Sequence, residues 1–219
     1  RGKGEGGVFS NFDKFGLPPP DIVRADSSMF HSVFSKNVSF DAIITDPPYG
    51  IRAGARKSGT SKERTKVIPA ERRHDHVPQT QVYPVSDVMS DLLTLAARSL
   101  TMGGRMVYLI PSLKDFDEGQ DLPRHPCLEL EWVCYQPLSL HLGRRMVVVK
   151  KVRPWEDERE EEWRAACWPN GRESAEKVER LREQLAKAGK EGQGENDGKT
   201  KKRRKKEQRN EVTIKSFAD

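Results

Sequence analysis

The sequence predicts an α/β fold whose sheet ends in an antiparallel pair of strands. Two apolar strand patterns separated by one amphipathic helix indicate a parallel strand–helix–strand unit. Two more strand patterns follow at 128–135 and 146–152, joined by a connection that contains Pro137 and Gly143. Such a connection is compatible with an antiparallel pair. We therefore expect a mixed sheet with an antiparallel edge.

The N-terminal third contains three expected elements. Apolar residues recur at helical spacing within 8–15, and Gly16 supplies a stop, so a short helix is expected there. Residues 21–25 (DIVRA) predict a short strand that ends at Asp26. Residues 40–45 (FDAIIT) form an apolar run, which is typical of a parallel strand covered on both faces.

The clearest helix starts at Ser86, a good N-cap residue, with Asp87 favourably placed against the helix dipole. Its buried face is marked by apolar residues at helical spacing, and Gly103 with Gly104 is expected to end it. Residues 105–110 (RMVYLI) predict the next buried strand. The intervening residues 51–84 show no periodic pattern, so we expect a long loop of the kind that is functional or disordered.

Composition divides the 219 residues into a packed part and solvated parts. Hydrophobic residues make up 35% and charged residues 33%, which is too polar for uniform packing. We expect a core-forming domain over 1–153, an acidic linker with an amphipathic helix over 154–188, and a disordered basic tail over 189–219.

The net charge of +6 comes from one short segment. Residues 199–209 hold eight basic residues and one acidic residue, so the rest of the chain sums to about neutral. A second basic excess lies in the loop 52–73. The tail segment has three readings: a nuclear localisation signal, a nonspecific RNA-binding tail, or a solvated end.

Several classes of protein are disfavoured. No apolar run approaches the roughly 20 residues of a membrane-spanning helix, and no signal peptide opens the chain, which starts at Arg1 as a fragment would. Three cysteines without CxxC spacing indicate neither a disulfide framework nor a zinc site. His74 and His76 have no third candidate ligand nearby, so we expect no metal site. A reduced, cytoplasmic location fits best, with nuclear import by 199–209 as the alternative.

The motif that carries chemistry is Asp46-Pro47-Pro48-Tyr49, at the end of the strand 40–45. Ligands of open α/β sheets bind at the carboxyl ends of strands. A carboxylate at Asp46 and the Pro47 carbonyl can both accept hydrogen bonds from an exocyclic amine of a nucleobase, which directs the nitrogen lone pair towards a methyl donor. Proline stiffens the turn, and Tyr49 offers a face for stacking a flipped base. The alternative is a Pro-Pro strand terminator beside an incidental aspartate.

The basic loop after this motif is a candidate RNA-binding element, since phosphate contacts supply much of the affinity for nucleic acids. The alternative is a solvated loop with chance charge. The residues proposed for RNA contact are Arg52, Arg56, Lys57, Arg72 and Arg73.

Four segments together carry a resemblance to a known family. They are the strand and motif 41–52, the helix and strand 86–111, the segment 125–130 (HPCLEL) and the hairpin 139–152. The chain over residues 9–153 resembles the eukaryotic tRNA guanine-N2-methyltransferases that modify the guanosine at position ten.

The resemblance implies a Rossmann-like sheet that uses S-adenosylmethionine, tRNA as substrate, an RNA-binding THUMP module, and a small zinc-binding activator subunit as partner. Asp46, Pro47, Pro48 and Tyr49 match the catalytic turn of the family. Asp26, with Ser27 beside it, matches the acidic position expected to contact the adenine amine of the cofactor. The alternative for Asp26 is a helix N-cap or turn residue.

The chain also departs from the family pattern. The first two strands, the Gly-rich turn between strand and helix, and the THUMP module are absent, so 1–153 is expected to be a partial methyltransferase domain. Strand 40–45 should then present an unpaired edge, and 21–25 should be detached from the sheet. We expect the chain alone to be inactive or weak. The alternative functions are an adenine-N6 methyltransferase on RNA or DNA, and a truncated non-catalytic form that binds RNA or a partner.

Overall fold

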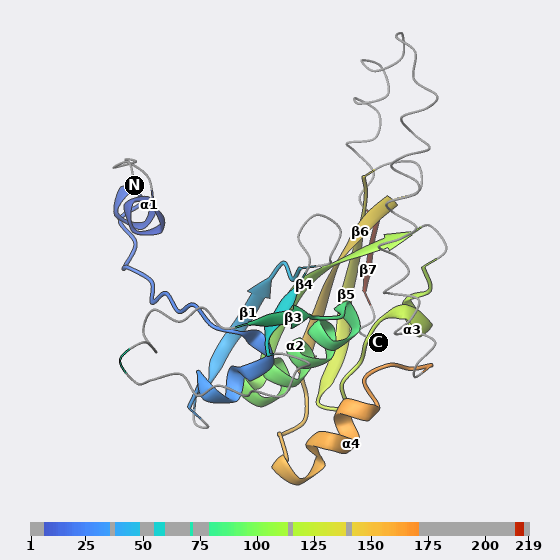
Figure 1. Cartoon of the computed structure of the whole chain (residues 1–219). Helices are drawn as coiled ribbons and strands as arrows, with labels where there is room; N and C mark the ends of the chain where they lie inside the picture. The colour runs from blue at the N-terminus through green and yellow to red at the C-terminus, as the bar shows by residue number, and fades with distance from the viewer. Residues whose placement is uncertain are drawn as a thin grey trace, which may run out of the picture.

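The computed structural model describes residues 7–35, 38–48, 55–59, 71, 79–113, 116–138, 142–170 and 213–216 (Figure 1). The fold is mixed α/β, as predicted. Its main sheet has five strands in the order β1-β4-β6-β5-β7. These strands are β1 (Phe40–Thr45), β4 (Leu100–Leu113), β6 (Leu142–Lys151), β5 (Leu128–Pro137) and β7 (Thr213–Ser216).

Strand directions place the ends of three strands at one edge of this sheet. β1 pairs with β4 in parallel, whereas β6 is antiparallel to both β4 and β5. β1, β4 and β5 therefore run the same way and end at the same edge, which we call the carboxyl edge. The predicted antiparallel hairpin is confirmed as β5 and β6.

The other elements are short, apart from one helix. A separate two-stranded ribbon pairs β2 with β3. The elements outside the main sheet are α1 (Val8–Lys14), η1 (Ser27–Ser32), β2 (Arg56–Ser58), β3 (Thr80–Val82), α2 (Val85–Ser99), α3 (Glu118–Asp121), η3 (Asp157–Arg159) and α4 (Glu160–Ala165).

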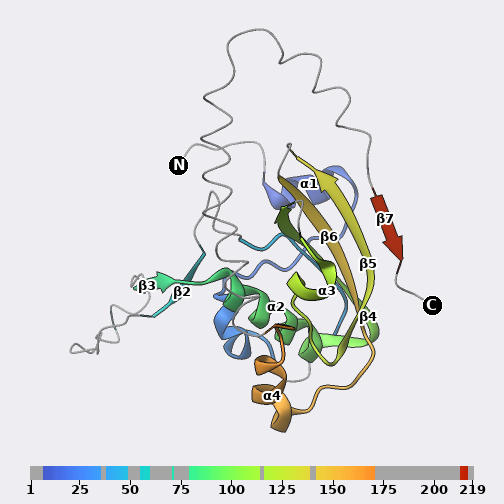
Figure 2. The ribbon, with the colours of Figure 1, turned by 90° about the vertical axis from the view of Figure 1, so that its right-hand side faces the viewer.

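The core lies between α2 and one face of the sheet (Figures 1 and 2). Met89 and Leu93 of α2 pack in one cluster with Met106, Tyr108 and Ile110, which alternate along β4. Each of these side chains is buried, which stabilises the fold by about 1.5–3 kcal/mol per large apolar residue. Apolar side chains that recur about every 3.6 residues on the helix thus pack against apolar side chains that recur every 2 residues on the strand.

The opposite face of the sheet is open in the described part of the chain. Ile44 of β1 is 83% exposed, and Trp132 and Met146 are also exposed. The expectation that 40–45 is covered on both faces is therefore wrong here. Among the described strands, β1 lies at one edge of the sheet.

The boundaries of α2 differ from the prediction. The helix starts at Val85, with Pro84 rather than Ser86 at the N-cap. It ends at Ser99, and β4 begins at once, so the glycines lie within the strand. Gly103 has φ +80°, and a Cβ on Gly104 would lie 3.0 Å from the Asp41 carbonyl oxygen. Glycine is needed there because β1 and β4 approach closely at an irregular register.

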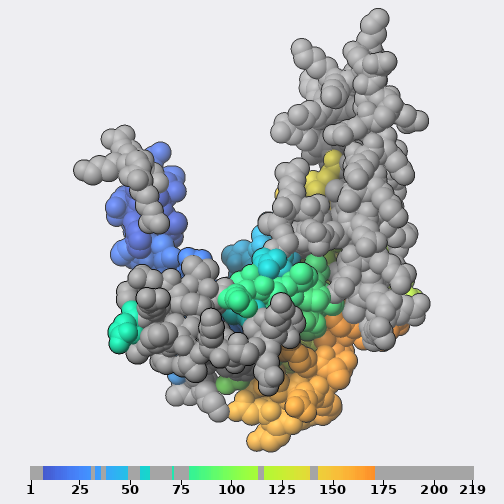
Figure 3. All heavy atoms as spheres, in the orientation of Figure 1, coloured from blue at the N-terminus to red at the C-terminus, as the bar shows by residue number. Residues whose placement is uncertain are grey.

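The N-terminal segment is confirmed in part. The predicted helix is present as α1, and Gly16 follows it with φ +63°. None of its residues is buried, and it projects from the rest of the described chain (Figure 3). The predicted strand 21–25 is wrong, because these residues form no regular element; they lie outside the sheet, as expected.

The C-terminal segment differs from the predicted linker and tail. Within the acidic stretch, α4 buries Trp163 against Ala97 of α2 and Cys127. Residues 213–216 form β7, which pairs with β5. This strand lies within 189–219, where a disordered tail was expected. The predicted amphipathic helix 172–187, the basic segment 199–209 and the His74–His76 pair lie outside the described residues.

Candidate active site

The Asp46-Pro47-Pro48 turn lies at the carboxyl edge, directly after β1. Thr45, the last residue of β1, pairs with Tyr108 of β4, which continues beyond that level to Leu113. The Pro47 side chain is buried, whereas Asp46 and Pro48 are exposed. A buried ring with a fixed φ holds the turn in place, so the Asp46 carboxylate has both an anchored backbone and access to solvent. Tyr49 lies outside the described residues.

Asp26 is the N-cap of η1. One oxygen of its carboxylate, Oδ1, accepts hydrogen bonds from the Ser28 amide at 2.9 Å and the Ser28 hydroxyl at 2.7 Å. The other oxygen, Oδ2, accepts a hydrogen bond from the Ser58 amide of β2. The local geometry is that of the N-cap alternative. The Ser28 and Ser58 hydrogen bonds thus engage most of the roughly four acceptor sites of this carboxylate. Ser27, the second expected cofactor residue, is exposed beside it.

The environment lowers the pKa of Asp26. Burial acts to raise this pKa, whereas the hydrogen bonds from Ser58 and Ser28 lower it. The net effect is a pKa below the ordinary value of 3.8. A carboxylate whose folded-state pKa is depressed stabilises the fold above its unfolded-state pKa and loses that contribution as the pH falls through the folded value. Asp26 is therefore ionised near neutral pH and holds η1 and β2 together.

Of the five predicted RNA-contacting residues, two lie in the described part of the chain, on β2. Arg56 is exposed, and its Nε and Nη2 donate to the Oγ1 and carbonyl oxygen of Thr80, at 2.6 and 2.7 Å. Lys57 forms an ion pair with Asp87 at 3.1 Å and lies 5.0 Å from the ring centre of Tyr83. Lys57 is thus engaged within the protein, while Arg56 keeps an exposed guanidinium. Arg52, Arg72 and Arg73 lie outside the described residues.

The expected cofactor site and the expected RNA-binding loop, which the sequence analysis considered separately, are in contact in the structure. The Ser58 hydrogen bond joins the expected cofactor residue Asp26 to the base of the expected RNA-binding loop. The prediction of an unstructured loop over 51–84 missed the ribbon of β2 and β3, because each strand has only three residues. Ser58 was missed as well: it acts through its backbone amide, which no side-chain pattern reveals.

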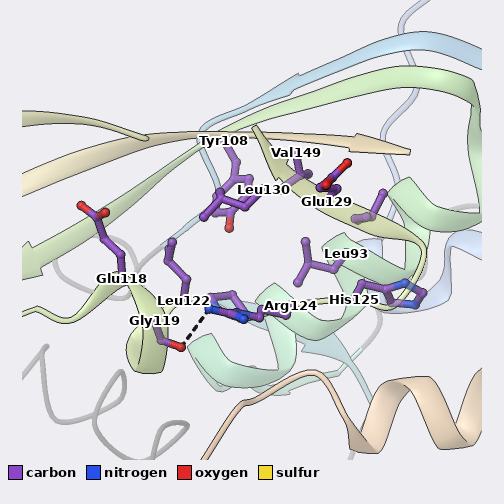
Figure 4. A pocket seen from close by; sticks show the side chains of 12 residues that line it. Leu93, Tyr108, Glu118, Gly119, Leu122, Arg124, His125, Glu129, Leu130 and Val149 are labelled. Carbon is purple, nitrogen blue, oxygen red and sulfur yellow. Dashed lines mark hydrogen bonds between the residues drawn. The ribbon is translucent and has the colours of Figure 1, made fainter. Parts of the chain in front are cut away.

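A cavity of about 400 Å³ lies away from this turn, between α2, α3 and the sheet (Figure 4). Leucine side chains from α2, β5 and the segment after α3 form much of its wall, and Arg124, Glu118 and Glu129 add charge. Tyr108 reaches into it from β4, and its buried hydroxyl finds no hydrogen-bond partner among the described residues. None of the predicted site residues in the described chain lines this cavity.

His125 is a buried structural histidine. Its ring lies 5.9 Å from Trp155 and 5.5 Å from Trp163, and its Nδ1 accepts a hydrogen bond from the Cys127 amide. Burial, with a smaller contribution from the charge of Lys151, lowers the pKa of His125 to about 4. Among the described residues, no group of three or more metal-ligating side chains is close enough to hold a metal ion. In the same part of the chain, no helix has the length and apolar content of a membrane span.

A scan against protein-family models finds no match. Similar proteins of known name do exist: one from Dictyostelium discoideum is 53% identical over 123 residues, which is 55% of this chain and 24% of that protein. Others from Xenopus laevis and Homo sapiens are 42% and 40% identical over 154 residues, or 68% of this chain and 31% and 33% of theirs. All three are named tRNA (guanine(10)-N(2))-methyltransferase TRMT11. The chain is homologous to a part of these methyltransferases.

The match agrees with the resemblance carried by the motifs, and it falls on the C-terminal part of the TRMT11 proteins. The chain spans about a quarter to a third of the length of these relatives.

Proposed function

We propose that this chain is the C-terminal catalytic part of a tRNA guanine-N2-methyltransferase like TRMT11, which transfers a methyl group from S-adenosylmethionine to the guanosine at position ten. The observation that carries the proposal is the Asp46-Pro47-Pro48 turn at the carboxyl end of β1, in a chain whose relatives are named for that activity. Both the adenine-N6 and the non-catalytic alternatives stay as outcomes of the test.

Asp46 and the Pro47 carbonyl accept hydrogen bonds from the N2 amine of guanine. Two acceptors at fixed positions orient the amine and draw its nitrogen towards tetrahedral geometry, so that its lone pair is available for attack. Preorganisation of this kind accounts for much of enzymatic rate enhancement. Asp46 is also the nearest expected acceptor for the proton that leaves the amine. Tyr49 stacks on the flipped base.

The chain's own residues fit part of the cofactor site. S-adenosylmethionine supplies an electrophilic methyl on a sulfonium. Asp26 accepts a hydrogen bond from its adenine amine in addition to those from Ser28 and Ser58, with Ser27 alongside. We propose an incomplete Rossmann-like sheet in which two further strands and their Gly-rich turn complete this site, adjoining the open edge of β1. Alone, the 219 residues then bind the cofactor weakly.

The surrounding assignments follow from the same proposal. Residues 1–153 are a partial methyltransferase domain, 154–188 an acidic connection, and 189–219 a basic tail. The partners are tRNA and a small zinc-binding activator subunit, and the location is the cytoplasm. Arg52, Arg56, Arg72 and Arg73 contact tRNA phosphates, with Lys57 held by Asp87.

The test uses a full-length protein of the relatives' length with its activator and an unmodified tRNA transcript. Nucleoside mass spectrometry after reaction should show N2-methylguanosine at position ten. Formation of N6-methyladenosine would favour the adenine alternative, and RNA binding without any methylation would favour the non-catalytic one. Calorimetric titration of the 219 residues with S-adenosylmethionine tests the weak-binding expectation, which micromolar affinity would contradict.

A further inference from the structure

Arg145 lies at the carboxyl edge of the sheet, on β6. It pairs with Ile110 of β4 on one side and with Tyr135 of β5 on the other. Asp46 follows Thr45, which pairs with Tyr108, so Arg145 lies close to the same level along the sheet. Only β4 separates β1 from β6. Two strand spacings therefore put the backbones of Asp46 and Arg145 roughly 10 Å apart.

The guanidinium of Arg145 is held by aromatic rings. It lies 4.4 Å from the ring centre of Phe116 and 4.9 Å from that of Tyr135, and its Nε donates to Glu118 at 3.4 Å. The Tyr135 ring is itself fixed against β6, since a Cβ on Gly143 would lie 2.2 Å from it. An arginine held in this way loses little entropy when it binds a ligand.

One donor of this group is unsatisfied. Arg145 is only 8% exposed, and its buried Nη1 has no hydrogen-bond partner among the residues that the structure describes. On the neighbouring strand β4, the buried hydroxyl of Ser112 likewise has no partner within the described part of the chain. Leaving a buried donor unpaired costs free energy. Two such groups on adjacent strands at the proposed catalytic edge indicate a place for an acceptor atom that the described residues do not supply.

We propose that Arg145 is a specificity residue that donates a hydrogen bond from Nη1 to the O6 atom of the target guanine. The inference rests on the proposed function. When Asp46 and the Pro47 carbonyl hold N2, O6 lies on the same Watson–Crick edge of the base, on the far side of N1. Nη1 is covered in this structure, so the contact forms when the base displaces the groups over it.

The chemistry distinguishes guanine from adenine. Arginine is the side chain most often paired with guanine O6, whereas adenine presents an N6 amine, a donor, at the equivalent position. Two facing donors repel each other. A buried donor that is positioned to bind a substrate oxygen also discriminates strongly against analogues without that oxygen, because the donor then stays unpaired.

The experiment compares two bases within each variant. Full-length enzyme with its activator is given tRNA carrying guanine or 2-aminopurine at position ten. Both bases have the N2 amine, but 2-aminopurine lacks O6. The wild type should favour guanine in kcat/KM by at least about a hundredfold. In R145M the guanine rate should fall while the 2-aminopurine rate changes little, so that the ratio drops towards one.

The control and the contrary outcomes are defined by the same ratio. R144M changes the adjacent arginine, whose Nε donates to Gln136, and should keep the wild-type ratio. If R145M lowers both rates equally, Arg145 only supports α3 through Glu118 and the inference is wrong. If R145M does not fold, R145K takes its place, and an unchanged ratio there overturns the inference. Absence of guanine methylation in the wild type would instead refute the proposed function.

Discussion

The amide of Ser58 donates a hydrogen bond to the carboxylate of Asp26, across 32 residues of sequence. This bond joins the N-terminus of η1 to β2, and so joins a residue proposed to hold the cofactor to the base of a loop proposed to hold tRNA. Asp26 therefore has a structural role in addition to any role in binding.

Replacing Asp26 separates these two roles. Asp26→Ala removes the acceptor for Ser28 and Ser58, and should lower the free energy of unfolding by about 1–2 kcal/mol, as for other N-cap losses. Urea denaturation measures this. S28A, which removes only the hydroxyl donor, is the matched control and should cost less. If D26A keeps full stability yet binds S-adenosylmethionine less tightly in the full-length protein, Asp26 acts on the cofactor alone.

Neutralising the basic ribbon should affect tRNA binding unequally. R56Q removes an exposed charge and should weaken tRNA binding and reduce the slope of log affinity against log salt by about one. K57Q removes a lysine already paired with Asp87 and should change that slope little. Filter binding at several salt concentrations measures both. Equal effects of the two variants would show that the ion pair with Asp87 opens when tRNA binds.

The pH dependence of stability should carry a signature of His125. Its pKa is about 4 in the folded protein, against 6.5 for the ordinary residue, because it is buried. Between these values the unfolded chain binds a proton that the folded chain does not. Stability should therefore fall as the pH drops from about 6.5 to about 4, by up to about 3 kcal/mol.

The control for this prediction is His125→Gln, which has no titrating ring. It should flatten the dependence of unfolding free energy on pH in that window, whatever its effect on absolute stability. A slope identical to that of the wild type would assign the pH dependence to other groups.

The attachment of α4 to α2 depends on Asp91. The Asp91 side chain is 5% exposed and accepts hydrogen bonds from Tyr83 and Arg164. Arg164→Met leaves this buried carboxylate with the Tyr83 hydroxyl, and should destabilise the protein by about 2 kcal/mol. R159M, which removes a half-buried arginine of the same region that pairs with Glu162, should lower the melting temperature less. Similar losses in both variants would contradict a special role for Asp91.

Strands and helices with strong patterns could be predicted from the sequence, and weakly patterned ones could not. The apolar periods of α2, β4, β5 and β6 placed these elements correctly, because tertiary packing followed the pattern. Residues 21–25 have a strand-like composition but no partner strand, so they form no regular element. The burial of Trp163 depends on Ala97 and Cys127, which are far from it in sequence, and no local pattern indicated it.

The candidate site was predictable to the extent that it is continuous in sequence. Asp46-Pro47-Pro48 is a contiguous motif, and its place at the end of a parallel strand agrees with the prediction. Arg145, by contrast, has no sequence signal that indicates its position. Its burial between Phe116 and Tyr135 depends on the register of three strands, which charge patterns do not specify.

The rate of N2-methylguanosine formation by Asp46→Ala in the full-length enzyme with its activator tests the central claim most directly. With saturating tRNA and cofactor, the single-turnover rate should fall by at least about a hundredfold, because the variant loses one hydrogen-bond acceptor for the amine. The affinity for tRNA should stay within about twofold of the wild type, because the variant loses no phosphate contact. A variant that methylates guanine at the wild-type rate would contradict the account.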